Sequence, residues 1–113
     1  MMNKELLIKA NVDYENGKNR FAGNEALYEK YLLKFREDVH FAGAKAAYQT
    51  GDYENLLKET HALKGIAGTL GILDIYHASA EIVDAIREEN IDKIPALYNK
   101  LECSYEKMME ILK

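Results

Sequence analysis

The stretch HALKGIAGTLG, residues 61–71, decides the fold expected for this chain. It belongs to a helix-like pattern whose buried face recurs at spacings of three and four, through Leu56, Thr60, Leu63, Ala67 and Leu70. The same stretch contains three glycines, although alanine at each position would favour a helix by about 1 kcal/mol. His61 lies just off the buried face. The pattern therefore predicts an accessible imidazole beside Lys64 and above the bare backbone of Gly65 and Gly68.

The rest of the chain reads as helices of the same kind. Residues 28–46 carry apolar side chains at alternating spacings of four and three, which is typical of left-handed helical bundles. The face expected in the core consists of Tyr28, Leu32, Phe35, Val39, Ala42 and Ala46. Strand-like alternation is absent. We expect one all-α domain over residues 1–113, an antiparallel up-and-down four-helix bundle preceded by one or two short helices. The long helices are predicted over residues 24–49, 52–71, 72–86 and 92–112, with Asp52 and Asp92 as N-caps and Gly71 as a C-cap.

Composition excludes several classes of function. A net charge of -4 with scattered Lys and Arg argues against a nucleic-acid surface, because phosphate backbones require a basic patch. Cys103 is the sole cysteine, so neither an internal disulfide nor a cysteine metal cluster is expected. The sequence contains neither a long apolar run nor a basic-plus-apolar leader, so no membrane association is expected and a cytoplasmic location is predicted.

The residues His61-Ala62-Leu63-Lys64-Gly65, followed by Gly68 and Gly71, resemble the signature of the histidine-containing phosphotransfer (HPt) family of multistep phosphorelays. Two further segments share this resemblance. Arg20-Phe21, with Gly23-Asn24-Glu25 and then Tyr28, is similar to the start of that family's long helix, and Gly51-Asp52 is similar to its turn before the histidine helix. The resemblance covers residues 12–112.

The resemblance implies a phosphoryl carrier rather than an enzyme with its own ATP-dependent kinase activity. His61 would accept the phosphoryl group on Nε2, Lys64 would offset part of its negative charge, and Gly65 would leave room for it. The expected partners are a sensor histidine kinase and the receiver domains of response regulators, whose aspartate exchanges the phosphoryl group with His61. No cofactor is expected in this chain, because the magnesium ion belongs to the receiver, and a monomer is expected.

A docking surface for the receiver follows from the same resemblance. The receiver must bring its aspartate to the imidazole, so the helix near Gly65 and Gly68 should form part of the contact. We expect exposed apolar atoms of Leu57 and Ile72 at its edge.

The sequence departs from the family pattern on the facing helix. Many members carry Glu or Gln twenty-two residues after the histidine, where the side chain orients the ring, and Val83 occupies that position here. Asp84 and Arg87 are neighbours that could substitute, but the spacing assigns the role to neither.

Two other classes of function use the same pattern. Glu37-x-x-His40 and Asp74-x-x-His77 have the spacing of di-metal carboxylate bundles, which also require core carboxylates from the other two helices. A purely structural helical adaptor would need the apolar faces alone, and it gives no reason for glycines around an exposed histidine. Metal analysis distinguishes the first alternative, and acid-labile phosphorylation of His61 distinguishes the second.

Overall fold

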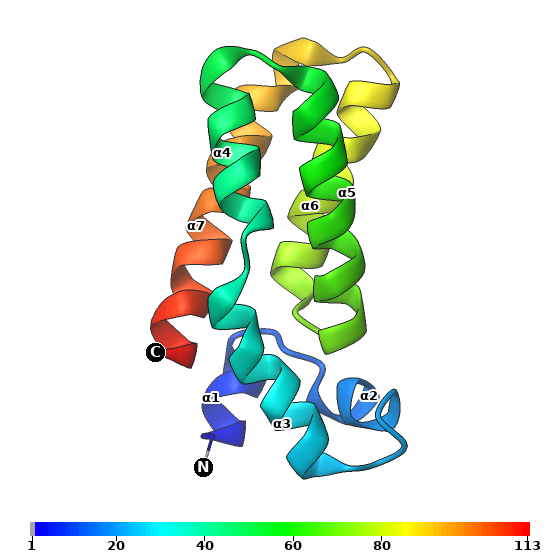
Figure 1. Cartoon of the computed structure of the whole chain (residues 1–113), viewed down its shortest axis with the longest axis vertical. Coiled ribbons are helices and arrows are strands. Elements are labelled where there is room, and N and C mark those ends of the chain that lie inside the picture. Colours follow the sequence, from blue (N-terminus) through cyan, green and yellow to red (C-terminus); the bar gives the residue numbers. More distant parts are fainter. Residues whose placement is uncertain (1) are drawn as a thin grey trace.

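The computed structural model describes residues 2–113, and these residues fold into a helical bundle of 40 × 24 × 21 Å (Figure 1). Within them no strand forms, and Val12 and Ile72 make an isolated antiparallel bridge. In the same range no helix is both long and apolar enough to cross a membrane. The α-helices are α1 (Lys4–Lys9), α2 (Tyr14–Asn19), α3 (Glu25–Lys34), α4 (His40–Thr50), α5 (Tyr53–Leu70), α6 (Leu73–Arg87) and α7 (Ile94–Leu112), with the short 3-10 helices η1 (Phe35–Glu37) and η2 (Ile91–Lys93).

Helix α5 has the boundaries and the buried face predicted for it. The Asp52 carboxylate accepts a hydrogen bond from the Asn55 N–H at the N-terminus, and this bond lowers the pKa of Asp52 below its usual value. Gly71 ends the helix in the left-handed conformation, at φ 77°. The side chains predicted to face the core are all buried: Leu56, Thr60, Leu63, Ala67 and Leu70. This face packs between α4 and α6.

The prediction of one long helix over residues 24–49 is wrong, because the helix is interrupted between α3 and α4 (Figure 1). Asp38 leaves the helical conformation, and its carboxylate accepts hydrogen bonds from the N–H groups of His40 and Phe41. The Tyr105 hydroxyl of α7 donates to the same carboxylate over 2.9 Å. The break rotates α4 so that Phe41 is buried, with its ring centroid 4.1 Å from that of Tyr105. Val39, expected in the core, is 69% exposed.

The start of the last helix also differs from the prediction. Asp92 lies within η2 and does not cap α7, which begins at Ile94 after a residue that makes no side-chain cap hydrogen bond. Pro95 lies in the first turn, where its missing N–H has no intrahelical partner to lose. The 3-10 turn directs Ile94 into the core, where it is fully buried.

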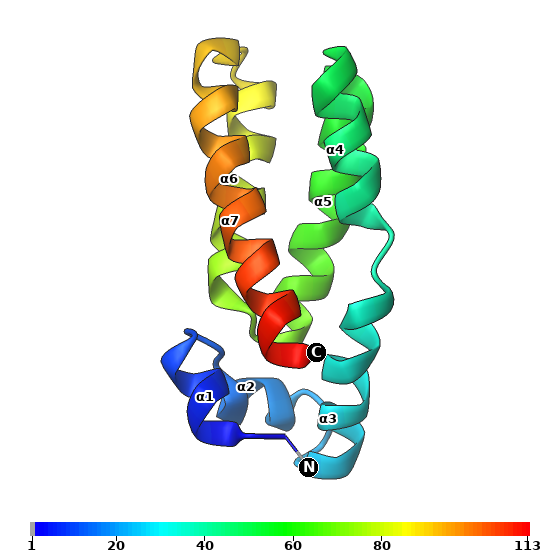
Figure 2. The same ribbon diagram turned by 90° about the vertical axis from the view of Figure 1, so that its left-hand side faces the viewer.

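The N-terminal helices close one end of the bundle (Figure 2). The Asp13 N–H donates to the Gly71 carbonyl over 2.8 Å, beside the bridge between Val12 and Ile72. The Tyr28 hydroxyl of α3 donates to the Leu70 carbonyl over 2.6 Å, and burial raises the pKa of this tyrosine. These bonds satisfy carbonyl groups at the C-terminus of α5. The end of the histidine helix is therefore fixed by the first quarter of the chain.

We predict that Gly71→Ala destabilises the fold more than Gly51→Ala. Both glycines have positive φ, which costs a residue with a Cβ roughly 1–2 kcal/mol. A Cβ at Gly71 would also lie 2.6 Å from the Asp13 carbonyl oxygen, whereas a Cβ at Gly51 meets no described atom within 4 Å. Urea unfolding followed by circular dichroism measures both variants. Equal losses would mean that the N-terminal segment yields freely at this turn.

Candidate functional site

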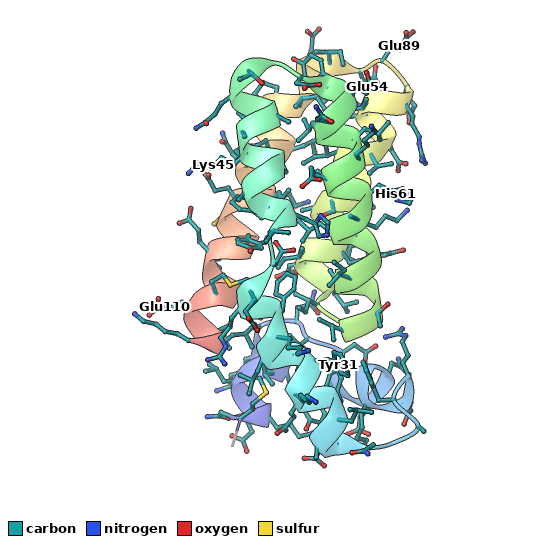
Figure 3. The ribbon with its side chains drawn as sticks, in the orientation of Figure 1. Tyr31, Lys45, Glu54, His61, Glu89 and Glu110 are labelled. Atoms are coloured by element: carbon teal, nitrogen blue, oxygen red, sulfur yellow. The ribbon has the colours of Figure 1, made fainter. Side chains whose placement is uncertain are left out.

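His61 lies in the middle of α5 with its side chain exposed (Figure 3). His61, Gly65 and Thr69 follow one another at intervals of one helical turn, and all three line two different hollows. They form a ridge between the hollows, and the ridge has no side chain at Gly65. The imidazole is thus open to an approaching molecule from either side.

The first hollow, which we call the apolar groove, has a volume of about 640 Å³ and lies between α5 and the segment from α3 to the start of α4. Tyr31 on α3 is 41% exposed there and lies below His61 in Figure 3. The charged or titratable lining residues among those described are Tyr31, Lys34, Glu37, Asp38, His40 and His61. The apolar lining residues are Phe21, Phe35, Val39, Ala62, Ile66 and Leu70.

The second hollow, which we call the basic hollow, has a volume of about 530 Å³ and lies on the other side of the ridge. Its described lining holds Arg20, Lys64 and His61 and includes no carboxylate, although the chain as a whole carries a net charge of -4. Arg20 Nη1 donates to the Thr69 carbonyl over 3.4 Å, which leaves most guanidinium donors available. This concentration of positive charge beside the histidine suits an anionic ligand.

The three glycines of the stretch have three different physical reasons. A Cβ at Gly65 would meet no described atom within 4 Å, so packing within the chain does not require glycine there. A Cβ at Gly68 would lie 3.0 Å from Tyr76 Cδ1, so this glycine lets the tyrosine ring of α6 pack closely on α5. Gly71 forms the left-handed C-cap. Of the three, Gly65 alone lowers helix stability without a packing reason in the described chain.

The expected docking residues are only partly in place. Gly65 and Gly68 line the basic hollow, as His61 does. Leu57 is half-buried one turn before His61 and is absent from the lining of both hollows. The expectation that Ile72 exposes apolar atoms at this edge is wrong, because Ile72 is 1% exposed. Its bridge to Val12 places it beneath the N-terminal segment, a tertiary contact that helical periodicity does not reveal.

The facing helix does not present a hydrogen-bonding side chain at the family's position. Val83 is fully buried, so its side chain points into the packed interior of the protein and not toward solvent. Asp84 and Arg87 are exposed, and neither lines the apolar groove or the basic hollow. A side chain that contacts a group bound to His61 is therefore expected from the residues that line the two hollows.

Sequence reasoning missed the surroundings of His40. The predicted helix face placed Val39 inward, but the break after η1 directs His40 inward instead, where its Nδ1 lies 3.6 Å from Glu59 Oε2. His77 is exposed and lines a separate hollow with Asp74, so the two carboxylate-x-x-His pairs are not brought together. Residues 2–113 contain no group of three or more His, Cys, Asp or Glu side chains arranged to hold a metal ion. Aspartate is a residue type favoured as a helix cap, but the apolar spacing continues past Asp38, so the sequence alone did not place the break there.

We predict that Gly65→Ala stabilises the fold by about 1 kcal/mol, because alanine is the better helix former and its Cβ enters open space. Gly68→Ala should gain less, because its Cβ presses on Tyr76. Denaturant unfolding of the two variants measures the difference. A larger gain for Gly68→Ala would show that the tyrosine ring moves away without loss.

Comparison of the chain with protein-family models, with curated proteins and with solved structures gave no match. A function for this chain is therefore inferred from its own residues and geometry. Its central features are an exposed histidine, an adjacent glycine without a packing reason, a basic hollow and an apolar groove.

Proposed function

We propose that this protein is a histidine phosphotransfer protein of a phosphorelay, with His61 as the phosphoryl acceptor. The observation that carries the proposal is the ridge at His61 and Gly65. A helical glycine with open space around it lowers stability by about 1 kcal/mol, and a function at the adjacent histidine accounts for its presence. The resemblance of residues 61–65 to the HPt signature supports the same assignment.

The proposed reaction moves a phosphoryl group between His61 and a receiver aspartate. The Nε2 lone pair attacks the phosphorus of the aspartyl phosphate, and an N–P bond forms as the P–O bond to aspartate breaks. The bonding electron pair remains on the aspartate carboxylate, and the proton on Nδ1 of His61 passes to solvent. The chain acts as a carrier and contributes no kinase activity. Magnesium and the acidic pocket come from the receiver, so no cofactor is assigned to this chain.

The basic hollow supports this reaction electrostatically. Lys64 lies three residues after His61, and its ammonium group can pair with the phosphoryl oxygens. The positive lining also favours approach of an acidic receiver surface. Transfer of this kind depends mainly on positioning and charge, and an exposed ridge flanked by cations can supply both.

The resemblance to the HPt family also supports proposals for the topology of the bundle, its partners and its location. We infer an antiparallel up-and-down four-helix bundle, formed by α4 to α7, which contact one another in chain order and lie along the long axis in Figure 1. A sensor histidine kinase and response-regulator receivers are the proposed partners. We further propose a cytoplasmic monomer that does not act on nucleic acids or membranes.

We predict that His61→Gln abolishes acid-labile phosphorylation, while His77→Gln leaves it intact. Both histidines are exposed on helices, so the two substitutions perturb the fold to a similar and small extent. Phosphoryl transfer from a phosphorylated receiver, followed with radiolabelled phosphate, measures the effect. Retained labelling in His61→Gln would remove the central assignment.

We predict that Gly65→Gln slows transfer from a receiver at least about tenfold, equivalent to about 1.4 kcal/mol. The new side chain would occupy the open space beside the imidazole and obstruct the approach of the receiver. Ala46→Gln is the matched control, because Ala46 is exposed on α4 and is absent from the lining of both hollows. Helix content should be retained in both variants, since glutamine is a good helix former. Normal transfer by Gly65→Gln would show that the receiver does not approach along this ridge.

A further inference from the structure

His40 and Glu59 form a pair that the proposed reaction has not used. Glu59 on α5 lies over Gly43 of α4, in space that any Cβ at Gly43 would occupy. Its carboxylate is 3.6 Å from Nδ1 of His40, which is buried and without a hydrogen-bond partner among the described residues. A buried imidazole nitrogen beside a carboxylate calls for a functional explanation. In this pair, the Glu59 carboxylate lies beside the inward-directed nitrogen of the His40 ring.

The other part of His40 faces the apolar groove. About a third of its side chain is exposed, and the residue lines this groove together with His61. The level of His40 along the bundle supports their proximity. Gly43 lies against Glu59, and α4 and α5 run in opposite directions (Figure 1). His40, three residues before Gly43, is therefore about level with Ala62, three residues after Glu59 and next to His61.

The position of His40 is fixed by contacts from Asp38 before α4, from α7 and from α5. The Asp38 carboxylate holds the first turn of α4 through the N–H groups of His40 and Phe41, and the Tyr105 hydroxyl of α7 holds that carboxylate. Asp38 is thus occupied by other donors. The carboxylate that approaches the ring itself is that of Glu59, 3.6 Å from Nδ1 of His40.

We propose that His40 is a second phosphoryl-binding residue and that Glu59 is its positioning residue. This inference rests on the proposed phosphorylation of His61. When the phosphoryl group occupies His61, the negative charge that it brings and the Glu59 carboxylate together favour the imidazolium form of His40, which takes its proton from solvent. Nε2–H then donates a charge-assisted hydrogen bond to a phosphoryl oxygen. His40 thereby supplies from α4 the contact that the buried Val83 does not supply from α6.

The test uses the full chain labelled with ¹⁵N and phosphoramidate as the phosphodonor. In the wild-type protein, phosphorylation should move the ring ¹⁵N resonances of His40 toward the imidazolium position and leave those of His77 in place. Glu59→Gln should diminish the movement. A role of His40 in packing alone would not produce this spectroscopic change.

Kinetics on matched variants give the second measurement. His40→Ala should lower the second-order rate constant for phosphorylation of His61 by about threefold or more, because a donor to the developing phosphoryl charge is lost. His40→Gln keeps an N–H donor and should recover part of the rate. His77→Ala, the control, should react at the wild-type rate.

The outcomes separate the two proposals. If wild-type protein takes up phosphoryl on His61 but the His40 resonances stay in place, the role of His40 is wrong and the proposed function stands. If the wild-type protein takes up no phosphoryl group from phosphoramidate or from a phosphorylated receiver, both proposals fail. The resonance measurement needs no substitution at His40, so loss of fold in a variant does not affect it.

Discussion

The burial of one face of α5 between α4 and α6 is the constraint on which the rest of the structure depends. Leu56 and Leu63 are fully buried there, and each contributes about 1.5–3 kcal/mol by leaving water. Each contribution exceeds the roughly 1 kcal/mol by which a helical glycine weakens the helix. The inner face of α5 can therefore support glycines that shape the outer face. The exposed histidine is held by a helix whose stability comes from its opposite side.

Close approach between helices sets what the surface presents. Gly68 admits the ring of Tyr76 from α6, and Gly43 admits the carboxylate of Glu59 from α5. Both contacts lie beside the ridge that carries His61, one on each side of α5. Gly65 admits no side chain from the described chain and stays open. Of these three helical glycines, Gly43 and Gly68 thus have their open side occupied by a side chain of a neighbouring helix, whereas the space beside Gly65 is unoccupied.

Charge around the histidine is separated although the chain is acidic overall. Arg20 and Lys64 lie in the basic hollow, whose described lining has no carboxylate. The carboxylates Glu37 and Asp38 line the apolar groove on the other side of the ridge, together with Lys34. Arg20 reaches this hollow from the N-terminal region, where its guanidinium group bonds the Thr69 carbonyl. The N-terminal helices therefore close the bundle and also supply charge to the proposed phosphoryl site. This arrangement suits a carrier that contacts acidic and apolar parts of a partner at once.

The sequence by itself determined the all-helical class, the limits and buried face of α5, and the exposure of His61, because these depend on local spacing and on residues that begin or end helices. Only the tertiary structure decided the break at Asp38, since burial of Phe41 against Tyr105 from a distant helix outweighs the continuous pattern through Val39. The same break placed His40 beside Glu59. Ile72 was buried by the N-terminal segment, and the ring of Tyr76 occupies the space beside Gly68 but not the space beside Gly65. Periodicity records which face of a helix is apolar, but contacts between distant segments decide which part of that face another segment covers.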